Sequence, residues 1–383
     1  MKIADIRVRA FWYPSQEKRD SHGHTHFVGE HRATQALVTI VCDDGSEGHC
    51  FGPAQSLRPY VIDSFFKPHL LGQDPYHRER LWLTLADMQR VSVGQLTDKA
   101  LAAVEMALWD WAARKANIPV YKMIGAFRDK VPAYGSTMCG DQISGGLSTP
   151  EDYARFAEKL VQRGYKAIKL HTWNPPISWA PDPKMDVKAC AAVREAVGPD
   201  IALLLDPYSA YSRVEALWLG KEIEKLGFAW YEEPMREASK SSFEWLARNL
   251  DIPIVGPETM EGRYQTRAEW IVSGACDITR TGVTDVGGIG PSLKIIHLAE
   301  SFGMDCEIHR EGPGNLALCA VQSNGRWYER GLLHPFIDYD RTPPYLNQHC
   351  DQMDAEGFVH LPQIPGLGYD INFDYINAHP VEI

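Results

Sequence analysis

The chain has 383 residues, of which 44% are hydrophobic and 23% are charged, an ordinary globular composition that can bury a large core. No apolar run approaches the roughly 18 to 20 residues that cross a membrane, and charges interrupt the first segment, so we expect a cytoplasmic protein without a membrane partner. A formal net charge of −11 and the absence of any Lys/Arg cluster disfavour nucleic acid as a partner, but they do not exclude an anionic small molecule.

The first part of the chain, residues 1–125, is predicted to form an α+β module. Strand-like runs occupy residues 1–11 and 35–52, and the second run contains a hairpin-turn sequence at residues 42–48. From Asp98 onward, apolar residues recur at helical spacing as far as Pro119 and Gly125. This pattern predicts a long buried helix that ends in a turn.

Residues 126–345 alternate short apolar strands with amphipathic helices, which is typical of parallel βαβ units. The predicted strands lie at residues 131–137, 167–172, 201–207, 229–234, 253–258, 278–283 and 304–309. Seven or eight such units in succession favour a (β/α)₈ barrel of the TIM type. An open doubly wound sheet would usually carry G-x-G-x-x-G after its first strand, and this sequence has none. Residues 346–383 return to short strands and turns, and we expect them to complete a cap with the N-terminal module.

Three acidic residues each follow an apolar strand: Asp206, Glu232 and Glu258. Each follows the previous one after 26 residues, the length of one β-loop-α-loop repeat, so the three carboxylates should meet at the C-terminal mouth of the barrel. An all-oxygen site of this kind suits Mg²⁺. The alternative is that acidic residues simply face water at strand ends. By strand alternation, the neighbouring Glu233 should point away from the mouth.

Basic residues are predicted on both sides of the carboxylates. Lys169 and His171 are two residues apart on one strand, so both should face the barrel interior. His309 ends a strand on the far side, and Glu329 follows in the next strand-like segment. A base opposite another base is what stereochemically controlled proton transfer requires. The alternative is a structural histidine beside a surface lysine.

These residues, together with the segments ALWDWAARKANIPVYKMIG and IPGLGYDI, resemble the mandelate racemase subgroup of the enolase superfamily over essentially the whole chain. The resemblance implies that Asp206, Glu232 and Glu258 bind Mg²⁺ and that a base removes the proton next to a substrate carboxylate. Enzymes of this superfamily use a Lys or His base together with Mg²⁺ that stabilises the enediolate. Lys169 matches the first lysine of the K-x-K motif of the subgroup, but His171 replaces the second.

The resemblance assigns His309 to the histidine of an opposing His-Asp dyad and Glu329 to the acid that hydrogen-bonds the substrate. Gly282 stands where the aspartate of the dyad is expected. Without an orienting carboxylate, His309 is a weaker base and a better general acid, unless Asp285 takes that role. We therefore expect His171 to be the base, because imidazole accepts a proton at neutral pH more readily than lysine, with Lys169 as a neighbouring cation.

A histidine-rich segment lies where the cap of this subgroup contributes a specificity loop, and it contains His22, His24, His26 and His31. Polar donors there suit a polyhydroxylated substrate, although a surface metal site and a solvated loop are alternatives. The residues expected to bind substrate are His24, His26, Tyr208 and Arg280.

The sequence therefore predicts an acid-sugar dehydratase with Mg²⁺ as cofactor. An epimerase or lactone cycloisomerase, and a barrel that binds sugar acids without turnover, are alternatives. Similar proteins usually assemble as homo-oligomers, which we also expect here.

Overall fold

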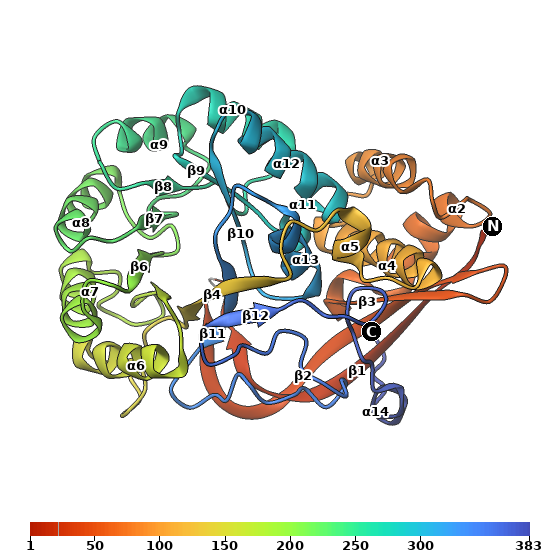
Figure 1. Cartoon of the computed structure of the whole chain (residues 1–383), viewed down its shortest axis with the longest axis horizontal. Coiled ribbons are helices and arrows are strands. Elements are labelled where there is room, and N and C mark those ends of the chain that lie inside the picture. Colours follow the sequence, from red (N-terminus) through yellow and green to blue (C-terminus); the bar gives the residue numbers. More distant parts are fainter. Residues whose placement is uncertain (22) are drawn as a thin grey trace.

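The computed structural model describes residues 1–21 and 23–383 and places a parallel barrel beside an antiparallel cap (Figure 1). His22, one of the histidines of the predicted specificity loop, lies outside the described residues.

The cap contains an antiparallel sheet in the order β1-β2-β3, formed by β1 (Ile3–Arg19), β2 (Thr25–Cys42) and β3 (Glu47–Gly52). The β1–β2 hairpin extends well beyond the strands predicted from the sequence. In Figure 1 it runs from the cap along the barrel. Its far end lines a cavity in which Arg19 and His24 lie beside residues of the barrel.

Both faces of the cap sheet are covered, which explains the nearly continuous burial at the end of β2. One face packs with α4 (Asp98–Ala116), while Phe11, Leu37 and Phe51 on the other face pack with residues of the C-terminal segment. The helix predicted from Asp98 to Gly125 is divided into two. α4 ends at Asn117, which has a left-handed φ of 54°, and α5 (Val120–Ile124) begins after Pro119. Proline cannot donate the backbone hydrogen bond that would continue the first helix.

Parallel strands form the barrel and confirm the predicted fold class. They are β4 (Lys130–Thr137), β5 (Ala167–Leu170), β6 (Ala202–Leu205), β7 (Trp230–Glu232), β8 (Ile254–Val255), β9 (Ile278–Thr281), β10 (Asp305–Ile308) and β11 (Tyr328–Leu333). Consecutive strands pair from β4 to β10, and β11 pairs with β4. The strands end earlier than the sequence predicted, so several polar residues expected at strand ends lie just beyond them.

The barrel is nearly closed, and side-chain and loop contacts link β10 to the chain before β11. The Glu307 carboxylate accepts backbone N–H groups of Arg326 and Trp327 at 2.9 and 3.2 Å, and the Asn324 carbonyl accepts the N–H of Cys306 at 2.6 Å. A buried carboxylate therefore supplies acceptors that a strand ladder would otherwise provide.

Helices surround the barrel on the outside (Figure 1). They are α6 (Pro150–Arg163), α7 (Pro183–Val197), α8 (Arg213–Lys225), α9 (Lys240–Ala247), α10 (Arg263–Ser273), α11 (Val283–Val286), α12 (Ile289–Ser301) and α13 (Pro313–Val321). On the cap side lie α1 (Pro59–Val61), α2 (Lys67–Leu70) and α3 (Arg78–Met88). Within the part of the chain that is described, no helix is both long and apolar enough to cross a membrane.

The C-terminal segment contacts both the barrel and the cap. β12 (Phe358–His360) pairs antiparallel with β4, whereas α14 (Phe373–Ala378) lies against β1 and Pro380 bridges to Phe11. The sequence predicted the return to the cap, and the contact with the barrel is an addition from the structure. The proposed boundaries at residues 125 and 345 stay a prediction.

Candidate active site

Three carboxylates lie together at the C-terminal end of adjacent strands. Asp206 follows β6 directly, Glu232 ends β7, and Glu258 lies three residues beyond β8. All three are buried, and the ligand oxygens of the group lie within 4.8 Å of one another. Burial raises the pKa of Glu232 to about 8, although Arg280 and Lys169 act in the opposite direction. A bound cation would keep the three groups ionised, and an all-oxygen donor set fits Mg²⁺.

Lys169 and His171 reach this cluster from β5 and its end, as strand alternation predicted. The Nζ atom of Lys169 lies 3.2 Å from Glu232 and 3.0 Å from Glu329. Burial alone would lower the pKa of Lys169, but the charges of these carboxylates raise it well above its usual value. Lys169 is therefore held as a cation.

The His171 ring is held from both sides. Its Nδ1 atom lies 2.5 Å from the Thr137 carbonyl oxygen, and its Nε2 atom lies 3.0 Å from Oδ2 of Asp206. Because a carbonyl oxygen only accepts, Nδ1 carries a proton, while Nε2 faces the Asp206 carboxylate. The Tyr208 ring packs against the imidazole at a centroid distance of 4.6 Å.

His309 does have an orienting carboxylate, Asp285, which is the alternative that the sequence left open. Its Nδ1 atom lies 2.7 Å from Oδ2 of Asp285, and its Nε2 atom lies 3.0 Å from Oε1 of Glu258. Burial lowers the pKa of His309, but the charges of Glu258 and Asp285 outweigh this effect and raise the pKa to about 9. Two carboxylates, one at each ring nitrogen, favour the doubly protonated imidazole.

Gly282 makes room for this contact. A Cβ atom at position 282 would lie 2.5 Å from Oδ2 of Asp285 and 2.8 Å from the carbonyl oxygen of His309. The carboxylate of Asp285 therefore occupies the space that a side chain at position 282 would need. The short helix α11 brings Asp285 back to this position.

Glu329 and Arg280 form the base of the site. Arg280 is completely buried; its Nε atom lies 2.6 Å from Glu232, and its Nη2 atom lies 2.9 Å from Glu329 and 3.0 Å from the Tyr134 hydroxyl. Glu329 lines the cavity, whereas Arg280 is not among its lining residues. The predicted role of Arg280 in binding substrate stays a prediction, and its geometry favours positioning the carboxylates.

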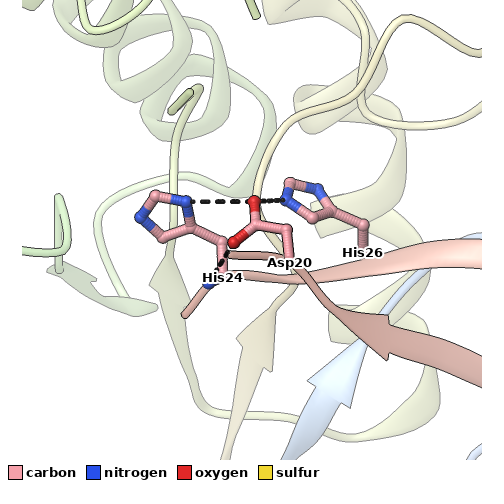
Figure 2. Close-up of side chains that lie close together, drawn as sticks. All are labelled: Asp20, His24 and His26. Carbon is pink, nitrogen blue, oxygen red and sulfur yellow. Dashed lines mark hydrogen bonds and ion pairs between the residues drawn. The ribbon is translucent and has the colours of Figure 1, made fainter. Parts of the chain in front are cut away.

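The cap histidines His24 and His26 lie on either side of Asp20 (Figure 2). His26 Nε2 and His24 Nδ1 lie 2.9 and 3.5 Å from Oδ2 of Asp20, and His24 Nδ1 also lies 3.0 Å from the Pro175 carbonyl oxygen. His24 and Tyr208 line the cavity and pack edge to face at 5.1 Å, while His26 is not among the lining residues. The ligand atoms of Asp20, His24 and His26 lie within 4.8 Å, so both expected alternatives, substrate contact and a metal site, stay predictions.

The structure also adds residues that the sequence did not indicate. Glu233 lines the cavity rather than pointing away, because its left-handed φ of 38° ends the strand alternation. Arg19 and Arg310 line the same cavity, whose volume is about 350 Å³. Arg310 follows His309 directly, but Arg19 could not be assigned without knowing how far the hairpin extends.

Comparisons with known proteins agree with this geometry. The family "Mandelate racemase / muconate lactonizing enzyme, N-terminal domain" matches residues 13–125, and the family "Enolase C-terminal domain-like" matches residues 152–375. The crystal structure of D-glucarate dehydratase from Agrobacterium tumefaciens complexed with magnesium is 58% identical and superposes with a TM-score of 0.98, covering 100% of this chain and 99% of that chain.

More distant relatives carry out different reactions. D-galactarolactone cycloisomerase of Agrobacterium fabrum (strain C58) is 30% identical over 98% of this chain and 97% of that protein. Arabinonate dehydratase of Saccharolobus solfataricus is 29% identical over 96% of each.

Proposed function

Because the chain belongs to the mandelate racemase/muconate lactonizing enzyme family of the enolase superfamily, we propose that it is a Mg²⁺-dependent acid-sugar dehydratase. The observation that carries the proposal is the pair of unlike imidazoles that face the carboxylate cluster. His171 has one carboxylate neighbour, Asp206 at Nε2, whereas His309 has a carboxylate at each ring nitrogen.

The Mg²⁺ ion would be held by Asp206, Glu232 and Glu258 and would stabilise negative charge that develops on the substrate carboxylate. Lys169 adds a fixed positive charge beside Glu329. His171 accepts the proton from the carbon next to the carboxylate at Nε2, and Asp206, 3.0 Å away, stabilises the imidazolium that forms.

His309 completes the elimination as general acid. The bond from the neighbouring carbon to its hydroxyl oxygen breaks with the electron pair on oxygen, and the proton of His309 converts the leaving group to water. The resulting enol tautomerises to a 2-keto-3-deoxy acid. The substrate class is a sugar acid, which the D-glucarate dehydratase and arabinonate dehydratase relatives support.

A second function, lactone cycloisomerisation or epimerisation, is favoured by the supported dyad and by the cycloisomerase relative. An oriented His309 can also return a proton to carbon on the opposite face. The support from Asp285 removes the main reason for expecting a barrel without turnover.

One experiment separates these functions. A panel of aldonic and aldaric acids is incubated with the enzyme and Mg²⁺ in D₂O, α-proton exchange is followed by NMR, and 2-keto-3-deoxy product is measured by a ketone-specific colour reaction. We expect exchange together with ketone formation. Exchange or isomerisation without ketone supports the second function, and no exchange with any acid contradicts both.

Variants at the two histidines test the assignment of acid and base. His171→Asn should lose both α-proton exchange and product, with kcat lower by at least about 10²-fold. His309→Asn should lose product to a similar degree but keep exchange. If the results are reversed, His309 is the base.

A further inference from the structure

Two arginines at the active-site cavity have no ion-pair partner among residues 1–21 and 23–383. Arg19 is the last residue of β1 in the cap, and Arg310 follows His309 at the end of β10. Both side chains line the same cavity as Glu258 and His309. They come from different parts of the fold, so both reach the cavity only when the cap and the barrel pack together.

The other cations of the site are neutralised. Lys169 contacts Asp206, Glu232 and Glu329, and Arg280 contacts Glu232 and Glu329. The charge of Arg19 and Arg310 is not engaged in an ion pair with the carboxylate cluster in the described part of the chain. It is available for an anion that enters the cavity.

Arg310 combines a buried donor atom that has no partner in the described chain with an unusual backbone conformation. Its Nε atom is buried and has no hydrogen-bond partner within the described chain, whereas buried donors are nearly always paired. Its φ of 71° is unusual for a residue other than glycine, and the carboxylate of Glu329 holds this backbone by accepting its N–H at 2.8 Å. Backbone strain of this kind and an unused donor are typical of ligand sites.

The positive charges also act on one another. Burial lowers the pKa of Arg19, and the charge of Arg310 lowers it further. Lys99, near the start of α4, has its pKa lowered by burial and then by Arg310 and Arg19. Asp285 and Glu311 act favourably on Arg310, but neither forms an ion pair with it in the described chain, and Asp285 is bound to His309. An anion between the arginines would relieve this repulsion.

We propose that Arg19 and Arg310 bind the second carboxylate of a dicarboxylic sugar acid, so that the enzyme prefers aldaric over aldonic acids. This assignment rests on the proposed function, which places the first carboxylate at the metal site. An aldonic acid ends in a neutral CH₂OH group and leaves both guanidinium groups without a counter-charge. A carboxylate matches the planar donors of arginine and can bind two of them at once.

The test compares acids that differ only at the far end: galactarate with D-galactonate, and D-glucarate with D-gluconate. For the wild type, we expect kcat/KM to favour the aldaric member of the pair. Arg19→Gln should lower this preference by about 10-fold or more, mainly through KM, because a charge-assisted contact to one end of the substrate is lost. Arg310→Gln should do the same, and Arg310→Lys should recover part of the preference.

Arg9→Gln is the matched control, because Arg9 is an exposed arginine of the same strand and is not among the residues lining the cavity. It should leave the preference unchanged. Calorimetric binding of the aldaric acid to His171→Asn protein, with and without Arg19→Gln, gives a readout independent of turnover. Arg19→Gln should weaken this binding by about 10-fold.

The outcomes separate the two proposals. If aldonic and aldaric acids are turned over equally and Arg19→Gln changes both to the same extent, the second-carboxylate site is wrong while the dehydratase function stands. Tighter binding of 6-phosphogluconate than of either aldaric acid would assign the arginines to a phosphate and also overturn the proposal. If no acid of the panel exchanges its α-proton, the function itself fails.

Discussion

At the residue scale, Gly282 and Asp285 form a coupled pair that sets the environment of His309. Any side chain at position 282 would collide with the Asp285 carboxylate, so glycine at one position is required by aspartate at the other. The Asp285 carboxylate, which lies three residues beyond Gly282 in the chain, reaches Nδ1 of His309. A partner of this kind orients the imidazole and stabilises its protonated form.

Asp285→Asn tests this positioning role. The loss of a negative charge 2.7 Å from Nδ1 should lower the pKa of His309, so the alkaline limb of the pH profile of kcat/KM should move to lower pH. Product formation should fall by about 10- to 100-fold.

Gly282→Ala offers a second route to the same state, because its Cβ atom displaces the Asp285 carboxylate. It should shift the alkaline limb in the same direction. An unchanged limb in Asp285→Asn would show that this carboxylate does not act through His309.

At the element scale, Asp186 of α7 ties together the loops that follow β5 and β6. Its Oδ2 atom accepts the hydroxyl of Thr172 at 2.6 Å and that of Tyr211 at 2.5 Å, while Oδ1 has no partner within the described residues. Thr172 follows His171 directly, so this contact holds in place the backbone next to His171, the predicted base. Burial raises the pKa of Asp186 to about 7.

This raised pKa predicts a pH-dependent stability. Between about pH 4 and pH 7 the folded state binds a proton that the unfolded state has lost, so the free energy of unfolding should fall as pH rises through this window. A shift of about three pKa units corresponds to at most about 4 kcal/mol. Asp186→Asn, which resembles the protonated acid, should remove this part of the slope in urea unfolding.

Glu195→Gln is the matched control on the same helix, because Glu195 is exposed. It should keep the slope of the wild type. A wild-type slope that persists in Asp186→Asn would mean that Asp186 is ionised in the folded protein throughout this range.

At the scale of the whole molecule, the site forms only when elements from distant parts of the chain pack together. The carboxylates come from the ends of β6, β7 and β8, and the hairpin β1–β2 brings cap residues to the same cavity. Glu105 of α4 joins cap and barrel by accepting the N–H groups of Ile289 and Gly290 at 2.8 and 2.9 Å, at the start of α12.

A ligand of the assembled carboxylates should therefore stabilise the whole fold. Mg²⁺ at a hundred times its Kd should add about 2.7 kcal/mol and raise Tm by a few degrees relative to protein in EDTA. Glu232→Gln should abolish most of this difference. Asp20→Asn, which alters the cluster at the hairpin, should keep it, and loss of the Mg²⁺ effect in Asp20→Asn alone would place the ion at the cap.

Much of the site could be predicted from the sequence because the positions of its residues depend on local periodicity. The barrel, the strand-end positions of Asp206, Glu232 and Glu258, and the shared face of Lys169 and His171 depend on strand alternation and on a repeat of constant length. The same reasoning failed at Glu233, where a left-handed backbone interrupts the alternation.

Only the tertiary structure decided which charges meet. The contact of Asp285 with His309 depends on how α11 turns, and the approach of Arg19 to Arg310 depends on how far a cap hairpin reaches over the barrel. The sequence determined the chemistry that each strand end presents, because side-chain direction within a strand is a local property. Pairings between distant segments are set by packing, and these pairings determine which cations at the cavity remain free to bind an anion.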